Sequence, residues 1–286
     1  MAKIPKMSLM ATDASSAFSP LRGERTFRPE RALQLGYVDL AEDFPRPEAG
    51  KAYDLVSASS KRVGEVPYPE SEIKRMHLDL YEFYVHDLPD FLSARNEGML
   101  KVQGSTKNPL DLSGSMTDAA FVAEFSAKDR SYAPGFLHRG VFRNLLIQEW
   151  VTLSFELYEL DSDASEYYGK IKGVIEGVPE IKSLDILKGI PYLNLATQLF
   201  DGIIRTFGRN ADDHLWGEIP ILEINPTPGG AFLRTGIYLL AEKLHSGKKV
   251  VELSDLQYKD GWVHRKRGKK LPNHLLFGVS LSRYSA

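Results

Sequence analysis

The stretch MHLDLYEFYV, residues 76–85, decides the fold class. Its apolar residues come close to alternating with polar ones, and the residues HDLP follow directly. A period of two residues is typical of a β-strand with one buried face, and Asp and Pro are common in turns. The stretch therefore predicts a strand that ends in a turn.

Similar short apolar stretches recur along the chain, separated by segments rich in Gly, Asn, Pro and Ser. Regular short strands with turn residues between them favour a β-sandwich or barrel over alternating strands and helices. We expect Trp150 and Phe155 to anchor the core, and Asp260-Gly261 to form a hairpin turn. The further strands are expected at residues 98–105, 119–127, 144–160 (one long strand or two), 215–224, 231–243 and 274–283.

Two regions depart from this pattern. Residues 1–71 are rich in Pro, Ser, Arg, Glu and Gly, which predicts an extended N-terminal arm or linker. Within residues 172–210 the apolar period lengthens, and the spacing over 193–207 predicts a helix packed on the sandwich. The expected fold is thus a mainly β, antiparallel sandwich over residues 72–286, with an inserted helical segment at 172–210 and an arm at 1–71.

Composition narrows the functional classes. The chain has 286 residues, a net charge of −2 and no cysteine. A balanced charge argues against a globally basic nucleic-acid binder, and the lack of cysteine excludes disulfides, cysteine nucleophiles and thiolate metal sites. The N-terminus lacks the apolar region of a signal peptide, and no run of about 18 apolar residues occurs. We therefore expect a cytoplasmic protein, with any membrane contact peripheral.

An acidic stretch, FELYELDSDASEYYGKI at 155–171, is the first candidate site. Glu159, Asp161, Asp163 and Glu166 follow an expected strand and precede a glycine. Ca²⁺ takes six to eight oxygen ligands, mostly carboxylates and carbonyls, which a loop of this kind supplies. The alternative is a solvated turn, in which the four carboxylates stay apart in water. Both interpretations remain open, and Ca²⁺ is the one cofactor that the pattern suggests.

The same stretch resembles the segment of the C-two domain family in which a strand ends in an acidic calcium loop. Glu159, Asp161 and Glu166 occupy the acidic positions of that segment. The stretch MHLDLYEFYVHDLPDFLSARNEGMLKV is similar to the family's first two strands and the acidic loop between them, with Asp90 and Glu97 as the loop acids. The resemblance implies a β-sandwich with these residues and Asp163 on one rim, and a peripheral-membrane or scaffolding role.

A basic run, HRKRGKK at 264–270, is the second candidate site. It could bind an anionic lipid surface, an acidic protein or nucleic acid, and the neighbouring tryptophan could stack or insert at an interface. The alternative is a basic hairpin loop that keeps other chains from pairing with an edge strand. The residues of this candidate site are Trp262, Arg265, Lys266, Arg267, Lys269 and Lys270.

Sites for catalysis have weaker support. Asp212, Asp213 and His214 could hold a metal ion, although a solvated loop between a helix and a strand fits them as well. Ser113 and Ser115 share one glycine between them and so lack the paired glycines of a nucleophile elbow. We therefore expect a non-enzymatic interaction or assembly module whose partner is a protein, a second copy or an anionic membrane. The alternatives are a structural subunit of a homo-oligomeric particle and a metal-dependent hydrolase.

Overall fold

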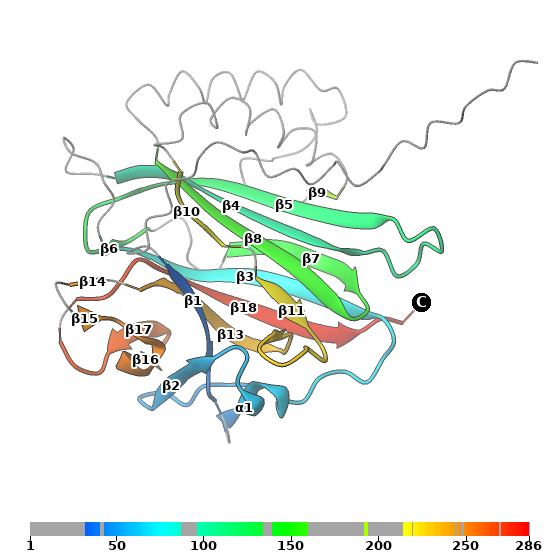
Figure 1. Ribbon diagram of the computed structural model, residues 1–286, viewed down its shortest axis with the longest axis horizontal. Coiled ribbons are helices and arrows are strands. Elements are labelled where there is room, and N and C mark those ends of the chain that lie inside the picture. Colours follow the sequence, from blue (N-terminus) through cyan, green and yellow to red (C-terminus); the bar gives the residue numbers. More distant parts are fainter. Residues whose placement is uncertain are drawn as a thin grey trace, which may run out of the picture.

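The structure is a computed structural model in which antiparallel strands form two large sheets, one above the other (Figure 1). The mainly β sandwich expected from the sequence is thereby confirmed. The described residues are 32–40, 43–86, 96–133, 139–159, 192–193, 214–218, 220–243, 245–246, 249–268 and 270–285. The helix expected within 172–210 lies outside these residues, apart from the short strand β9 (Tyr192–Leu193).

The first sheet has nine strands, in the order β17-β16-β2-β1-β13-β18-β3-β6, with β7 also paired to β3. Its strands are β1 (Leu33–Val38), β2 (Ala52–Ser57), β3 (Lys74–Val85), β6 (Ser131–Tyr132), β7 (Arg139–Ile147), β13 (Gly236–Glu242), β16 (Leu256–Lys259), β17 (Trp262–Arg265) and β18 (His274–Arg283).

The second sheet has seven strands, in the order β12-β11-β8-β4-β5-β9, with β10 also paired to β8. Its remaining strands are β4 (Asn96–Lys107), β5 (Met116–Ala127), β8 (Trp150–Glu159), β10 (His214–Glu218), β11 (Ile221–Glu223) and β12 (Ala231–Phe232). A separate ribbon pairs β14 (His245–Ser246) with β15 (Lys249–Val250). The strands predicted at 76–85, 98–105, 119–127 and 274–283 all form, and the 144–160 segment forms two strands rather than one.

The expected N-terminal arm is corrected in its second half. Strand β1 lies between β13 and β2, well inside the first sheet, and β2 pairs in turn with β16. Its burial explains the placement, because Tyr37 and Val38 are buried and their partners come from distant parts of the chain. The sandwich therefore begins by Leu33 rather than at residue 72.

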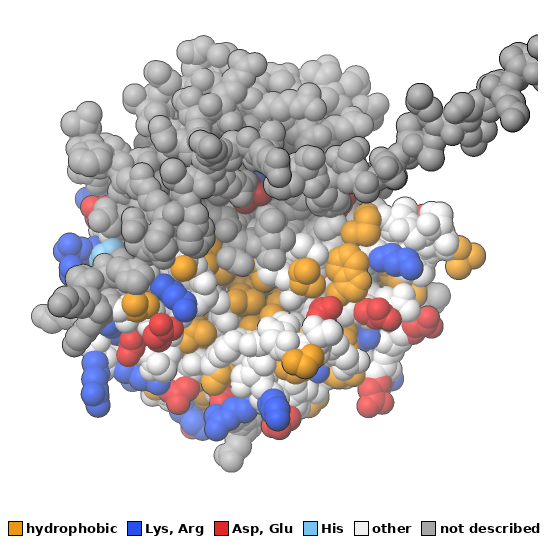
Figure 2. Space-filling model, viewed as in Figure 1, with side chains coloured by type: hydrophobic (Ala, Val, Ile, Leu, Met, Phe, Trp, Pro, Cys, Tyr) orange, Lys and Arg blue, Asp and Glu red, His pale blue; other side chains and the backbone are white. Residues whose placement is uncertain are grey.

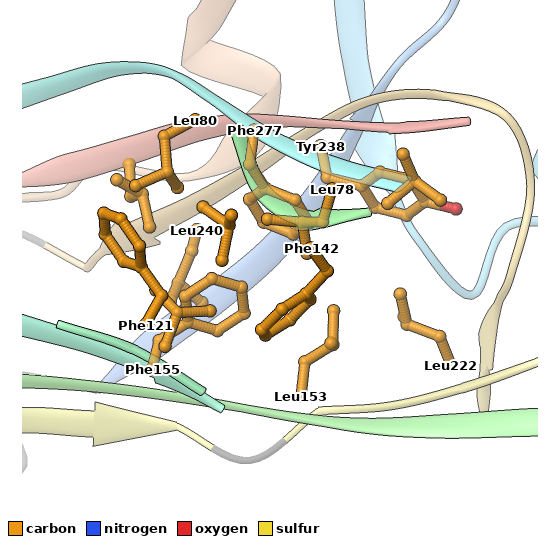
Figure 3. Packing of buried hydrophobic residues seen from close by; sticks show 14 of the residues in the cluster. Leu78, Leu80, Phe121, Phe142, Leu153, Phe155, Leu222, Tyr238, Leu240 and Phe277 are labelled. Atoms are coloured by element: carbon orange, nitrogen blue, oxygen red, sulfur yellow. The ribbon is translucent and has the colours of Figure 1, made fainter. Parts of the chain in front are cut away.

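The first core fills the space between the two sheets (Figure 3). Phe155 of β8 lies against Phe277 of β18, with ring centroids 4.9 Å apart, and Tyr238 stacks on Phe277 at 5.4 Å. Phe155 is the core anchor expected from the sequence, whereas Trp150 is half-buried and its strand neighbour Val151 points into the core instead. Alternation along a strand puts these two neighbours on opposite faces.

A second core lies on the other face of the first sheet, because the strands β2, β16 and β17 curl back over it. Leu239 and Leu276 of the sheet meet Tyr258 and Val263 of the β16–β17 hairpin there. The curl brings the two ends of the strand order together, since Trp262 of β17 lies 4.6 Å from Tyr132 of β6, ring to ring. The hairpin turn forms as predicted, with Asp260 and Gly261 both at positive φ.

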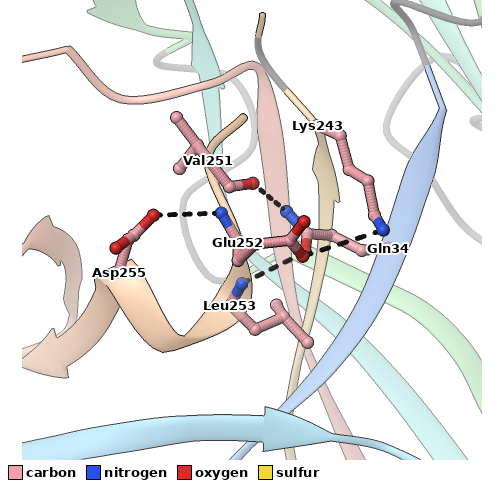
Figure 4. A network of polar contacts seen from close by, with 6 residues as sticks. All are labelled: Gln34, Lys243, Val251, Glu252, Leu253 and Asp255. Atoms are coloured by element: carbon pink, nitrogen blue, oxygen red, sulfur yellow. Dashed lines mark hydrogen bonds and ion pairs between the residues drawn. The ribbon is translucent and has the colours of Figure 1, made fainter. Parts of the chain in front are cut away.

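One buried amide fastens the connection that leads into this curl (Figure 4). The Gln34 side chain donates to the Val251 carbonyl at 2.8 Å and accepts from the Leu253 N–H at 3.1 Å. It thereby fixes the 3-10 turn Leu253–Asp255 that precedes β16. Helices are otherwise short in the described residues, where α1 (Lys61–Gly64) is a single turn and no helix is long and apolar enough to cross a membrane.

Candidate docking site

Exposed apolar side chains gather on the hairpin that joins β4 to β5. Leu112 is fully exposed, Leu110 is 55% exposed and Met116 is 45% exposed. Ile221 of β11 is the other large apolar residue with a mostly exposed side chain in the described part of the chain. Single exposed leucines are ordinary, but three such side chains within seven residues of a hairpin tip make this tip a candidate interaction site.

The turn that carries these leucines is held by its own polar groups. Asp111 accepts hydrogen bonds from the Ser113 N–H and hydroxyl, each at 2.8 Å, and from the Ser115 hydroxyl. Asn108 accepts from the Leu110 N–H at 3.0 Å, and Gly114 takes the positive φ of 75° that the turn requires. These bonds hold the turn in which Leu110 and Leu112 are exposed.

The same hydrogen bonds change the pKa of the Asp111 carboxyl group. The hydrogen bonds from Ser115 and Ser113 lower the pKa of its carboxyl group, because they favour the ionised form. The two serines considered from the sequence as nucleophiles are therefore donors to a carboxylate. Their hydroxyl groups stabilise the turn rather than carry chemistry.

The base of the hairpin is joined to the β7–β8 turn. The Thr106 hydroxyl donates to the Trp150 carbonyl at 2.7 Å, and Ser105 pairs with Thr152 in the sheet. Glu149 of this turn is exposed, and Gln148 beside it donates to Glu72 at 3.4 Å. In the loop 65–73, the β7–β8 turn and the hairpin 107–116, the exposed charged side chains are Glu65, Glu70, Glu72, Glu149 and Lys107.

We call this part of the molecule the hairpin end, defined by Leu110, Leu112 and Met116 together with Glu72 and Glu149. Figure 2 shows Asp and Glu side chains along the lower right of the face drawn, with a Lys or Arg side chain above them, and side chains of both signs on its left half. The hairpin end is thus apolar at its tip and negative at its base.

The predicted basic site forms the turn between β17 and β18, and its members differ in their contacts. Lys266 pairs with Asp54 at 2.7 Å, and Arg265 donates to the Lys270 carbonyl at 3.2 Å. Arg267 and Lys270 are exposed, and among the described residues neither makes an ion pair. Lys269 lies outside the described residues. We call residues 265–270 the basic turn.

The tryptophan predicted to serve at an interface packs within the chain instead. Trp262 is half-buried against Tyr132, which closes the curl of the first sheet. The strand that carries it, β17, is the last strand at one end of the sheet order. This position agrees with the interpretation that the basic residues guard a sheet edge.

The acidic rim is largely outside the described residues. Asp90, Asp161, Asp163 and Glu166 fall there, and for Glu97 and Glu159 only the backbone is described. Gly98 pairs with Glu159, so the register places Glu97 and Glu159 on neighbouring strands at the same end of the second sheet. Among the described side chains, no group of three metal-ligating residues occurs. The calcium site therefore stays a prediction.

The alternative metal site is likewise untested, since Asp212 and Asp213 lie outside the described residues and His214 is described only as backbone in β10. The sequence did not point to Glu82 and His274, which form a buried pair in the second core. The His274 Nε2 and Glu82 Oε1 atoms are 2.6 Å apart, and both side chains are fully buried.

The hydrogen bonds of His274 fix the number of protons in this pair. Nδ1 lies 2.9 Å from the Pro272 carbonyl oxygen, which only accepts, so Nδ1 carries a proton. The contact between Nε2 and Oε1 then holds one proton, and the pair is neutral overall whichever atom carries it. Tyr84 stacks on the imidazole at 5.2 Å. Because neither group reaches the surface, we assign the pair to the structure of the core.

The buried Arg234 ties α1 to the ends of β11 and β12 in the second sheet. Its guanidinium donates to the carbonyls of Ile224 and Leu233, each at 2.8 Å, and to that of Gly64 at 3.1 Å. It also lies 4.4 Å from the centre of the Tyr68 ring. Three carbonyls and a ring face compensate its burial, and the arrangement is that of a structural clamp.

Comparison with protein-family models, with curated proteins and with solved structures gave no match. The resemblance to the C-two domain family has therefore no support beyond the residues that suggested it. The hairpin end remains the feature of the described residues that most directly favours a function.

Proposed function

We propose that this protein is a non-enzymatic interaction and assembly module that docks through its β4–β5 hairpin. The observation that carries the proposal is the exposure of Leu112 and Leu110 on a turn fixed by Asp111. A rigid apolar tip loses little conformational entropy when it enters a pocket, whereas a flexible one loses much more. A small number of such anchors usually supplies most of the binding energy of an interface.

Magnitudes favour a protein surface over a membrane as the partner. Fully burying a leucine is worth roughly 1.5–3 kcal/mol, so two leucines provide about 3–6 kcal/mol. Stable peripheral membrane binding needs a second signal, typically a cluster of basic residues beside the inserted side chains. Lys107 is the one exposed cation in the hairpin, and glutamates lie at its base. A protein with an apolar pocket and positive charge around it fits better.

The proposal is tested with a double variant, Leu110→Ser/Leu112→Ser, and a matched control, Ile221→Ser. Ile221 is about as exposed as Leu110 but lies on β11, where it pairs with Thr152 of β8 rather than with the hairpin itself. Both variants should keep the thermal stability of the wild type, because exposed side chains contribute little to folding.

The readouts are recovery of proteins from the source cells with each chain as bait, and cosedimentation with vesicles of phosphatidylcholine and phosphatidylserine. We expect the double variant to lose a bound protein that Ile221→Ser retains, and neither chain to sediment with vesicles. Equal binding by both variants would overturn the proposal, and hairpin-dependent sedimentation with vesicles would replace the protein partner with a lipid surface.

A further inference from the structure

We infer that the hairpin end of one copy docks on the basic turn of a second copy, so that the chain associates head to tail. The inference rests on the proposed function and names its partner. Its basis is the complementary charge of two surfaces that lie at opposite ends of the same molecule.

The basic turn carries two exposed cations that pair with no described residue. Arg267 and Lys270 are exposed and make no ion pair among the described residues, whereas Lys266 is already paired with Asp54. Gly268, at a φ of 93°, shapes the turn between them. The backbone of the turn is held by the bond from Arg265 to the Lys270 carbonyl. The free charges thus stand on a supported turn.

The hairpin end carries exposed glutamates that form no ion pair with a described residue. Glu149 and Glu70 are exposed and make no ion pair in the described part of the chain, and Glu72 has only the long hydrogen bond from Gln148. Glu72 and Glu149 lie at the base of the hairpin, while the leucines lie beyond the last strand pair. A partner that fits must present positive charge beside an apolar contact, and the basic turn presents positive charge next to the partly exposed Leu271.

The two surfaces cannot meet within one chain. Strand β18 begins four residues after Lys270 and ends at Arg283. Arg283 pairs with Lys74 of β3, which pairs in turn with Ile147 of β7. Glu149 follows two residues after Ile147. The ten residues of β18 span about 33 Å at the usual rise of a strand. Figure 1 shows the hairpin and the C-terminus at one end of the molecule and the β16–β17 hairpin at the other. The contact must therefore join two molecules.

This geometry has a defined consequence for assembly. The two surfaces are different, so the contact is heterologous and each copy keeps one free hairpin end and one free basic turn. Repetition gives a ring if the rotation closes and a filament if it does not. Since opposite charges guide the encounter, the association should weaken as salt rises.

The test uses two charge-reversal variants, Glu72→Lys/Glu149→Lys and Arg267→Glu/Lys270→Glu. The first has two positive ends and the second has two negative ends, so each alone should self-associate at least ~10-fold more weakly than the wild type. A 1:1 mixture restores opposite charges at every contact and should recover association. Sedimentation velocity at low and high salt measures the wild type, both variants and the mixture, and thermal unfolding checks that each variant folds.

The outcomes separate the inference from the proposed function. A wild-type chain that stays monomeric at all concentrations, or a mixture that associates no better than its components, would overturn head-to-tail docking. The proposed function would survive that result if Leu110→Ser/Leu112→Ser still lost a different protein partner. Loss of neither self-association nor partner binding in that double variant would overturn the proposed function as well.

Discussion

The β16–β17 and β4–β5 hairpins use their apolar residues in opposite ways. The β16–β17 hairpin turns Tyr258 and Val263 into the second core and packs Trp262 on Tyr132. The β4–β5 hairpin pairs over its whole length, yet its tip leaves Leu110 and Leu112 exposed. Both turns are well formed, since each contains a glycine at positive φ and a carboxylate that accepts hydrogen bonds.

The comparison indicates that the leucines at the β4–β5 tip are not exposed because of a poorly formed turn. A hairpin that can bury its apolar residues against a neighbouring strand does so, as β17 shows. The β4–β5 tip has no such neighbour within reach among the described residues, and its leucines contribute nothing to folding. The proposed function assigns their contribution to contact with another molecule, and each prediction compares the two hairpins.

The largest effect is expected beneath the packed hairpin, at the pair of Glu82 and His274. His274→Ala leaves the buried Glu82 carboxyl without its partner, which should lower the free energy of unfolding by about 3–5 kcal/mol. Glu82→Gln keeps a hydrogen bond, because the amide donates to the unprotonated Nε2 of His274. It should cost about 1 kcal/mol or less. Denaturant unfolding measures both variants.

Glu82 also faces the tyrosines that line this region. Burial raises the pKa of Tyr132, and the nearby Glu82 carboxyl raises it further. If Glu82→Gln proved as costly as His274→Ala, the pair would be stabilised by the attraction of a charged imidazolium and carboxylate, rather than by a hydrogen bond that an amide can replace. The assignment of Glu82 and His274 as a pair that needs no charge separation would then be wrong.

The second prediction compares the two tips directly. Trp262→Ala removes the ring contact with Tyr132 and should cost about 2 kcal/mol, somewhat below the loss for a fully buried aromatic. Leu112→Ser should change the free energy of unfolding by no more than ~0.5 kcal/mol, since its side chain is fully exposed. Similar losses for the two variants would show that Leu112 packs against the molecule, which contradicts the proposed docking role.

The smallest effect concerns the order of the β4–β5 turn. The pKa of Asp111 lies below the ordinary value of 3.8, so its ionised form stabilises the folded turn above that value. This stabilisation is lost as the pH falls through the lowered pKa. Amide exchange at residues 110–115 should therefore accelerate locally in strong acid, and Asp111→Ala should produce the same acceleration at neutral pH. Unchanged exchange in that variant would mean that the turn does not depend on its carboxylate.

Much of the fold follows from local patterns. The alternation at 76–85 and the Asp260-Gly261 turn predict elements that form as expected, because their signals are contained within a few residues. The placement of residues 33–57 does not follow in this way. The strands β1 and β2 gain their partners, β13 and β16, from a region about 200 residues away, and no local pattern reveals such pairing.

The β4–β5 hairpin tip could not be predicted as a candidate site from the sequence for a related reason. The sequence NPLDLSGSM reads as an ordinary polar turn, and its two leucines become noticeable only when the register shows that they lie beyond the last strand pair. The basic run was visible at once, because consecutive charges are a local feature. Its relation to the hairpin end depends on the length of β18 and could not be inferred from spacing along the chain.

One measurement tests head-to-tail docking most directly. The chain has no cysteine, so a Ser113→Cys variant and a His264→Cys variant each carry a single thiol beside one of the two surfaces and keep its leucines and charged residues. Mixed and treated with a short bis-maleimide reagent, the two should form a covalent heterodimer in high yield at low salt. An Ile221→Cys variant mixed with His264→Cys should form little. A heterodimer yield for Ser113→Cys no greater than that of the Ile221→Cys control would contradict head-to-tail docking.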